Sequence, residues 1–288
     1  MTGQNNKPTW RELMAQNKPL VLPGAHDAFS ARLIADAGFP AYFIGGFPVI
    51  GARHGLPDVG LVGLGEMAQS INEMMMACPL PVLVDADDGY GDVKNLTRTM
   101  RTYERMGASA IFFEDQVAPK RCGHMAGKVL VPTEMMEAKL RAAVDAREDK
   151  EFFIIARTDA RDVDGLDEAF RRAERYLEAG ADGLFIESPR SVEELEKIGG
   201  SFGVPHLANM LEGGVTPILS NAELGEMGFS MVIHGINLLM RSARVMKETL
   251  TAIQQDNLKP DVNAVSFEEY KRLVGFGEWA AIDDKYKF

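Results

Sequence analysis

Three acidic residues and two glycines are crowded together directly after an apolar run in this sequence. They follow residues 82–84 and are Asp85, Asp87, Asp88, Gly89 and Gly91. Buried parallel strands are typically such short apolar runs, and Asp and Gly mark the turn that follows. Because crowded carboxylates repel one another, they favour a bound cation, and hard oxygen ligands suit Mg²⁺ or Mn²⁺. A solvated acidic turn is the alternative interpretation.

A second acidic strand end favours the metal interpretation. Glu114 and Asp115 follow the apolar run 111–113, about thirty residues after the first acids. A solvated turn explains one such acidic strand end more readily than it explains two.

The loop after Glu114 is unusually long and carries reactive side chains. Residues 115–132 precede the next expected helix, against about 2–6 residues in an ordinary strand-to-helix loop. Long loops of this kind are commonly lids. The segment Lys120-Arg121-Cys122-Gly123-His124 surrounds a thiol with cations, and nearby positive charge lowers a thiol pKa. Cys122 is therefore a candidate acid or nucleophile, with a passive surface thiol as the alternative.

The elements that position these residues repeat along the chain as strand and helix patterns. Short apolar runs predict eight strands, at residues 20–22, 41–44, 82–84, 110–113, 152–156, 183–186, 206–208 and 231–233. Helical patterns lie between them, and several end in a Gly before the next strand. Eight such units predict an α/β fold, a (β/α)₈ TIM barrel. A doubly wound open sheet is the alternative, but residues 23–26 are not the G-x-G-x-x-G that it requires.

In such a barrel the active site lies where the strands end. The expected strand ends, with the loop behind the second strand, carry polar or special residues at Gly45, Gly46, Phe47, Asp58, Asp85, Asp87, Glu114, Arg157, Glu187, Asn209 and His234. A purely structural requirement does not readily produce so many. They suit the stabilisation of an enolate, in which Mg²⁺ polarises a carbonyl oxygen and Arg157 neutralises a carboxylate.

Composition excludes several classes of protein. The 288 residues carry a net charge of −11, which disfavours nucleic acid as a partner but leaves small anionic substrates open. No apolar run approaches the roughly 20 residues that a membrane span needs. The polar N-terminus resembles no signal peptide, and two cysteines fit a reducing cytosol better than a disulfide framework. We therefore expect a cytoplasmic protein that binds no membrane.

The pattern changes after residue 255, so we expect a barrel domain at 1–255 and a C-terminal extension at 256–288. The extension begins with a linker-like stretch and continues as an apolar helix over residues 267–282, which includes Trp279. The apolar face of that helix is expected to pack against another apolar surface. Its own barrel and a neighbouring subunit are the two alternatives.

The chain resembles the isocitrate lyase/phosphoenolpyruvate mutase superfamily from about residue 20 to the final helix. The most specific segments are 85–91, 114–116, 120–124, 155–160 and 209–214, together with Thr216-Pro217. The resemblance implies a barrel whose last helix is swapped between subunits, usually in a homotetramer built as a dimer of helix-swapped dimers. It therefore favours the intersubunit position for helix 267–282.

The resemblance also implies roles for the candidate residues. Asp85 would bind Mg²⁺ directly, and Asp58, Asp87 and Glu114 would hold it directly or through water. Substrate contacts would come from Gly45, Gly46, Phe47, Gly123, Arg157, Asn209 and His234. The loop of Lys120, Cys122 and His124 would close over the substrate, with Cys122 as general acid supported by Glu187 and His124. The implied reaction cleaves a carbon–carbon bond in a 2-hydroxy di- or tricarboxylate, of the 2-methylisocitrate or 2,3-dimethylmalate type, and releases pyruvate or glyoxylate with a second acid.

Four residues depart from the superfamily pattern around the substrate. Ile44 stands where Ser or Thr is usual, Phe47 where small residues are usual, Asp88 where Thr or His is usual, and His234 where Tyr or Asn is common. Two other activities therefore stay open, which are carboxyphosphonoenolpyruvate mutase-like P–C chemistry and oxaloacetate decarboxylation or hydrolysis. A barrel without chemistry that serves as a binding subunit is the third hypothesis, and the retained metal acids argue against it.

Overall fold

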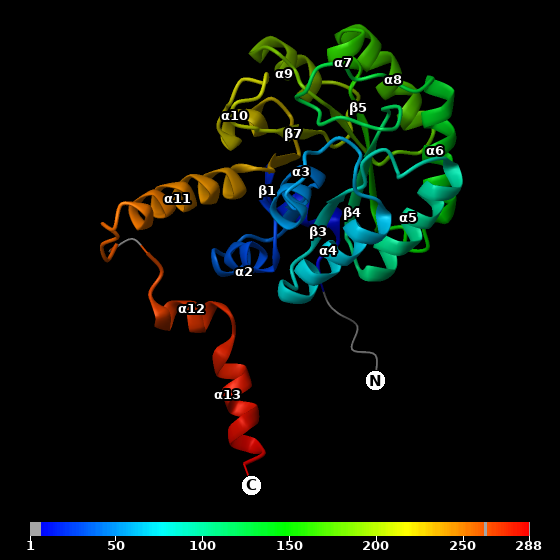
Figure 1. The fold of residues 1–288 in the computed structure, drawn as a ribbon. Coiled ribbons are helices and arrows are strands. Elements are labelled where there is room, and N and C mark those ends of the chain that lie inside the picture. The colour runs from blue at the N-terminus through cyan, green and yellow to red at the C-terminus, as the bar shows by residue number, and fades with distance from the viewer. Residues whose placement is uncertain (1–6, 262–263, 288) are drawn as a thin grey trace.

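Eight parallel strands form the centre of the computed structural model, which describes residues 7–261 and 264–287 (Figure 1). The strands are β1 Leu20–Ala25, β2 Tyr42–Ile44, β3 Val82–Asp85, β4 Ala110–Glu114, β5 Phe153–Thr158, β6 Gly183–Ile186, β7 Leu207–Asn209 and β8 Met231–His234. Their order is β6-β5-β4-β3-β2-β1-β8-β7, and a parallel bridge from Leu184 to His206 joins the two outer strands. The predicted (β/α)₈ barrel is confirmed.

Helices surround the barrel and cover its outer surface. They are α2 Ala28–Asp36, α4 Leu64–Ala77, α5 Val93–Met106, α6 Thr133–Ala146, α7 Ala160–Val163, α8 Leu166–Glu178, α9 Val192–Gly199 and α10 Asn221–Glu226. The start and end of α5 show how the sequence sets these bounds. The Asp92 carboxylate accepts hydrogen bonds from the first-turn amides, and Gly107 ends the helix at φ 92°, the left-handed conformation that favours glycine.

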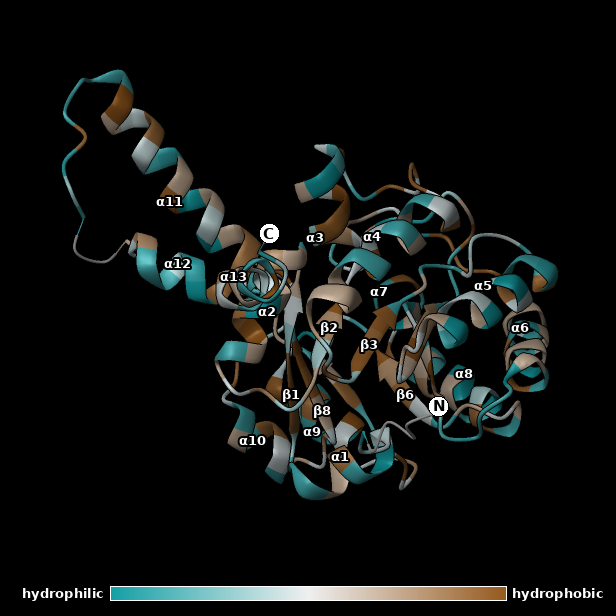
Figure 2. Ribbon diagram, turned by 90° about the horizontal axis from the view of Figure 1, so that it is seen from below, coloured by the Kyte–Doolittle hydropathy of each residue, from teal (hydrophilic) through white to brown (hydrophobic). Residues whose placement is uncertain are grey.

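The barrel interior is filled with buried apolar side chains. Strands such as β3 are hydrophobic along most of their length (Figure 2). One layer comes from four alternate strands, as is usual in this fold, and contains Phe43, Phe112, Phe185 and Ile233. The short helix α1 (Trp10–Gln16) contributes Trp10 to the same cluster, and the indole Nε1 lies 3.3 Å from Sδ of Met231.

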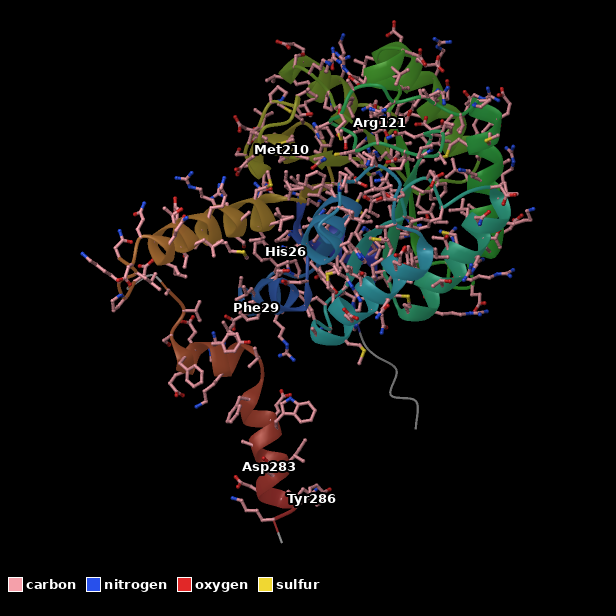
Figure 3. The ribbon with its side chains drawn as sticks, in the orientation of Figure 1. His26, Phe29, Arg121, Met210, Asp283 and Tyr286 are labelled. Atoms are coloured by element: carbon pink, nitrogen blue, oxygen red, sulfur yellow. The ribbon has the colours of Figure 1, made fainter. Side chains whose placement is uncertain are left out.

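The C-terminal segment leaves the barrel as three helices, α11 Asn237–Gln254, α12 Phe267–Leu273 and α13 Phe276–Lys285 (Figures 1 and 3). The prediction of one helix over residues 267–282 is wrong, because Gly275 breaks it at φ 75°. Helix α12 lies on α2, where the rings of Phe29 and Tyr270 are 5.6 Å apart. Neither α11 nor α13 contains a buried residue.

The structure does not test two of the predictions. Residues 1–6, whose polarity argued against a signal peptide, lie outside the described residues. The division into 1–255 and 256–288 stays a prediction. Within residues 7–261 and 264–287, no helix is long and apolar enough to cross a membrane.

Candidate active site

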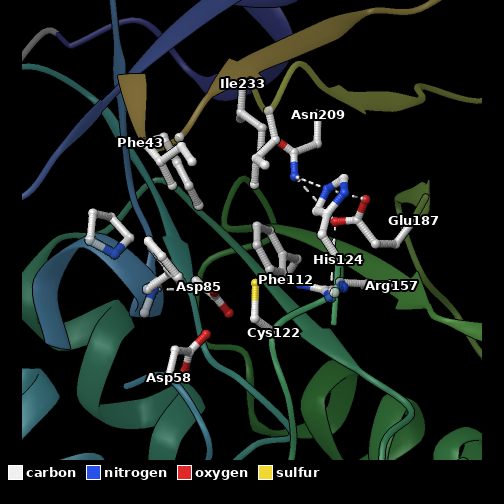
Figure 4. Close-up of a pocket in the computed structure, with 18 of the residues that line it drawn as sticks. Phe43, Asp58, Asp85, Phe112, Cys122, His124, Arg157, Glu187, Asn209 and Ile233 are labelled. Carbon is white, nitrogen blue, oxygen red and sulfur yellow. Dashed lines mark hydrogen bonds and ion pairs between the residues drawn. The ribbon is translucent and has the colours of Figure 1, made fainter. Parts of the chain in front are cut away.

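A pocket opens at the carboxyl end of the barrel and collects most of the predicted site residues (Figure 4). Its floor is the Phe43, Phe112, Phe185 and Ile233 layer. The predicted residues that line it are Gly45, Gly46, Phe47, Asp58, Asp85, Lys120, Cys122, Gly123, His124, Arg157, Glu187 and Asn209. Two short helical segments that the sequence did not predict, α3 Gly46–Val49 and η1 Ile50–His54, follow β2, and α3 lines the pocket with Gly46, Phe47 and Pro48.

The acidic side of the pocket is built from the turn after β3. Asp85 accepts a hydrogen bond from the Gly46 amide at 3.3 Å and another from the Asp87 amide at 2.9 Å. Asp87 has φ 50°, a conformation that is uncommon for residues other than glycine. Asp58 and Asp85 face the pocket, whereas Asp87 and Glu114 lie deeper and are almost completely buried.

The side chain of Lys120 lies among these acids. Its ammonium is 2.5 Å from Oδ1 of Asp58 and 2.6 Å from Oδ1 of Asp87. Burial opposes the charge on Lys120, but the surrounding carboxylates outweigh it and hold the pKa of Lys120 well above its usual range. Burial also raises the pKa of Asp87 to about 7, with Asp85 and Asp58 adding to the shift and Lys120 opposing it. Burial and the neighbouring carboxylates therefore favour the neutral form of Asp87, and the Lys120 ammonium offsets this effect only in part.

The carboxylate oxygens of these acids are chemically suited to binding a divalent cation. Oε1 of Glu114 is buried without a hydrogen-bond partner among the described residues, and burial raises the pKa of Glu114 despite the charge of Arg157. Unneutralised hard oxygen atoms are the ligands that Mg²⁺ prefers. In the described part of the chain, however, no three His, Cys, Asp or Glu side chains already converge as a metal cluster, since Lys120 and Arg157 stand between the acids.

The guanidinium of Arg157 is surrounded by the carboxylates of Glu114, Asp159 and Glu187. Its Nε and Nη2 both donate to Asp159 at 3.1 Å, Nη1 lies 3.0 Å from Glu114, and Nη2 lies 3.9 Å from Glu187. A buried charge needs such partners. In this structure Arg157 lines the pocket, but it neutralises the protein's own acids.

The predicted effect of the cations on Cys122 is wrong. Burial raises the pKa of the Cys122 thiol to about 11, and the charge of Asp58 adds to the shift. The backbone of His124 and the charges of Arg157 and Lys120 oppose it only in part. Both cations are already paired with carboxylates, which leaves little positive field for the sulfur. A thiol that stays protonated suits a proton donor rather than a nucleophile.

Glu187, His124 and Asn209 form the other side of the pocket (Figure 4). Nε2 of His124 lies 3.4 Å from Glu187, and the Asn209 amide donates to Glu187 at 3.2 Å. Burial alone would raise the pKa of Glu187, but its bonds to His124 and the charge of Arg157 lower the pKa to about 2. Glu187 is therefore an ionised, oriented partner for His124.

His234 does not belong to the pocket. Because side chains alternate along a strand, Ile233 of β8 faces the barrel interior and His234 faces outward. Nε2 of His234 lies 3.0 Å from Oδ1 of Asn221, at the start of α10. The prediction that His234 contacts the substrate is therefore wrong.

Sequence reasoning missed the apolar part of the pocket. The floor residues alternate along their strands and could have been found from that periodicity. Leu211 and Ile236, which also line the pocket, follow strand ends without any such signal. Behind the pocket, Asp115 accepts hydrogen bonds from Thr158 and Tyr176, both at 2.7 Å, and this support was not predicted either.

Comparison with known proteins agrees with this geometry. A family model described as phosphoenolpyruvate phosphomutase matches residues 10–254. The chain is 41% identical over 284 residues to a 2,3-dimethylmalate lyase from Eubacterium barkeri, which covers 98% of both chains.

Two solved structures extend the likeness to the fold. A 2,3-dimethylmalate lyase, described as a PEP mutase/isocitrate lyase superfamily member, has a TM-score of 0.89 at 34% identity and covers 96% of this chain and 94% of that one. An oxaloacetate acetylhydrolase in complex with 3,3-difluorooxalacetate has a TM-score of 0.91 at 28% identity and covers 96% and 95%. The chain belongs to the phosphoenolpyruvate phosphomutase family, within the PEP mutase/isocitrate lyase superfamily, whose members similar to it include enzymes named as lyases.

Proposed function

We propose that this protein is a Mg²⁺-dependent lyase that cleaves a 2-hydroxy di- or tricarboxylate of the 2,3-dimethylmalate or 2-methylisocitrate type. The products would be pyruvate and a second acid, formed through an enolate. The observation that carries the proposal is the position of the Cys122 thiol, which in Figure 4 lies between the acidic side of the pocket and the side of His124 and Glu187. Its raised pKa keeps it protonated at neutral pH.

The metal would be held by the acids after β2, β3 and β4, with Asp85 as the direct ligand and Asp58, Asp87 and Glu114 as direct or water-mediated ligands. Mn²⁺ is the alternative ion, since the same hard oxygen atoms suit it. The chemistry that a bound Mg²⁺ supplies is Lewis-acid polarisation of a substrate oxygen.

The chain's own residues would handle charge and protons. When a pocket carboxylate such as Asp58 accepts the proton of the substrate hydroxyl, the adjacent carbon–carbon bond breaks, one half becomes a ketone, and the other half leaves as an enolate. Cys122 then transfers its proton to the enolate carbon. The backbone of His124 and the charges of Arg157 and Lys120 would stabilise the thiolate that remains, while Glu187 orients the ring of His124. The amides of Gly45, Gly46 and Phe47 would hold a substrate carboxylate.

The apolar floor supports a substrate with alkyl groups. Phe112 stacks with Phe43 at a centroid distance of 5.7 Å and meets Phe185 edge-on at 5.3 Å. This rigid surface cannot solvate a charge, whereas it gains from contact with a methyl group. We therefore place the carboxylates of the substrate toward the polar sides and its alkyl substituents toward the floor.

The direct experiment measures pyruvate release from 2,3-dimethylmalate, 2-methylisocitrate and related 2-alkylmalates with Mg²⁺ present. Cleavage of one of them, and its loss in Cys122→Ser, is expected. Cys78→Ser is the matched control, because Cys78 is buried and lies outside the pocket. No cleavage of any of these compounds by the metal-loaded protein would reject the lyase proposal.

A second candidate is an oxaloacetate-directed hydrolase or decarboxylase. It is favoured by the TM-score of 0.91 to the oxaloacetate acetylhydrolase and by Phe47, which lines the pocket after β2. Ile44 does not contact the pocket, because it is buried in the core outside the barrel interior, so its departure from the superfamily pattern carries no argument about the substrate. Phosphonate mutase chemistry is the other alternative. Turnover of oxaloacetate by a protein that cleaves none of the 2-alkylmalates would support this candidate over the lyase.

We also propose a cytoplasmic homotetramer in which pairs of subunits exchange their C-terminal helices. The exposed apolar side chains of α13, which include Trp279 at 68% exposure, support this assembly. Within the described part of the chain, no side chain of α13 is buried.

A further inference from the structure

The loop over the pocket is fixed at its base by backbone pairing. The Val117 amide donates to the Val129 carbonyl at 2.7 Å, and the Val131 amide donates to the Asp115 carbonyl at 2.8 Å. The loop tip, Cys122 and Gly123, lies beyond this pairing and over the pocket. Its position therefore depends on other contacts.

Lys128 supplies one of those contacts from inside the loop. Its side chain is completely buried, and its ammonium donates to the Gly123 carbonyl at the tip. The same ammonium lies 3.0 Å from Oδ1 of Asp159 and 3.3 Å from Oδ2 of Asp162. The Gly123 carbonyl also accepts from Ser188 Oγ at 3.0 Å, so two donors from different segments hold it.

Asp159 connects this lysine to Arg157. Oδ1 of Asp159 accepts from Lys128 at 3.0 Å and from Nη2 of Arg157 at 3.1 Å. The Asp159 amide donates in turn to Asp115 at 3.0 Å, which anchors the carboxylate to the barrel. Burying an ammonium costs free energy unless carboxylates and hydrogen-bond acceptors surround it. The position of Lys128 under the tip is therefore maintained by these specific partners.

The tip has no free space on its pocket side. A Cβ atom on Gly123 would lie 2.4 Å from Nη2 of Arg157 and 2.8 Å from Cγ of Glu187. Gly123 is therefore in close contact with the side chains of Arg157 and Glu187. If its carbonyl were released, the only free direction for the tip would be away from the pocket, and Cys122 would move with it.

We propose that Lys128 is a positioning residue that clamps the Cys122–Gly123 turn against Arg157 and Glu187. It does not touch the reacting atoms. By bonding both the tip and Asp159, it makes the closed loop and the orientation of Arg157 depend on each other. The inference builds on the proposed role of Cys122 as proton donor, but the position of the thiol can be tested without any substrate.

The test compares Lys128→Met with the wild-type protein in a Cys78→Ser background, so that only Cys122 can react with N-ethylmaleimide. Below the unfolding temperature, alkylation of the variant should be faster by about tenfold or more, the effect expected for loss of a hydrogen bond from a charged donor. With a substrate that the wild type cleaves, kcat should fall by a similar factor. KM should change by no more than about threefold. Arg121→Met is the matched control, because that cation lies in the same loop but does not bond Asp159.

Alkylation and kcat at wild-type levels in Lys128→Met would overturn the proposal. If Lys128→Met does not fold, Asp162→Asn takes its place, since it weakens the hold on the ammonium and leaves Lys128 bound to Asp159. A smaller but measurable acceleration of alkylation supports the clamp, and no acceleration contradicts it. Because alkylation needs no turnover, failure of the proposed lyase reaction would be recognised separately.

Discussion

Nζ of Lys120 lies 2.5 Å from Oδ1 of Asp58, and both side chains are about 95% buried. A divalent cation at these acids must share them with the ammonium or displace it. We therefore expect Lys120→Met to be destabilised by about 3–5 kcal/mol without metal, because its buried acids lose their partner. Calorimetry should show Mg²⁺ binding at least about tenfold more tightly to the variant, because the repulsion between the ammonium and the metal ion is removed.

The control for this prediction is Arg121→Met, which removes a cation from the same loop without touching the acids and should leave Mg²⁺ affinity unchanged. Weaker Mg²⁺ binding by Lys120→Met would show that the ammonium does not compete with the metal for the acids. Thermal unfolding should also show that Mg²⁺ restores part of the stability that the variant loses.

The thiol of Cys122 should react slowly near neutral pH. With a pKa of about 11, roughly one thiol in a thousand is ionised at pH 8, and the ionised fraction grows about tenfold with each pH unit until pH 11. Iodoacetamide labelling followed by peptide mapping should therefore accelerate throughout the range from pH 7 to pH 10. A labelling rate that levels off below pH 8 would mean that the thiol is activated as a nucleophile.

Replacing Gly123 by Ala should open the loop. The added methyl group would overlap Nη2 of Arg157, and because that guanidinium is held by Asp159 and Glu114, the loop must move instead. We expect kcat to fall by about 100-fold, as for other small displacements of a catalytic group. Gly65→Ala, at a position with open space around it, should keep wild-type turnover. Equal activity in the two variants would contradict the close approach of the loop.

Stability should increase from pH 5 to pH 7 because of a buried histidine. Burial lowers the pKa of His206 below 6.5, so the unfolded chain binds the proton more tightly than the folded one. The contribution is complete above pH 6.5 and decreases as the pH falls below it. Urea unfolding of the wild type and His206→Gln at pH 5.5 and 7.5 measures the difference. If the difference in free energy of unfolding between the two proteins is the same at both pH values, His206 is not the cause of the pH dependence.

The strands and acidic strand ends were predictable because their signals are local. A short apolar run that ends in Asp, as at Asp85, gives both the strand and the pocket edge without knowledge of other segments. The orientation of His234 was not predictable, because it depends on the register of β8 with β1, where His234 pairs with Pro23. A shift of one residue exchanges the inner and outer faces of a strand.

The electrostatics of the site also escaped sequence reasoning. The neighbours of Cys122 in sequence are cations, but Lys120 pairs with Asp58, which is 62 residues away. Lys128 gave no signal for the same reason, since its partner Asp159 is 31 residues away. Contacts between distant segments decide which charges remain available, and periodicity in a single sequence does not contain them.

The assembly can be tested on one face of α13. Phe276, Trp279 and Ile282 are spaced three residues apart and are each about half exposed or more, so they form an apolar stripe that the residues described in the structure leave uncovered. If subunits exchange these helices, Trp279→Glu buries a charge in the interface and should reduce the tetramer to smaller species in sedimentation velocity experiments. Asp284→Asn, about 140° around the same helix, should leave the mass unchanged. A wild-type chain that sediments as a monomer would contradict the exchange, since the stripe would then be stable in water without a partner.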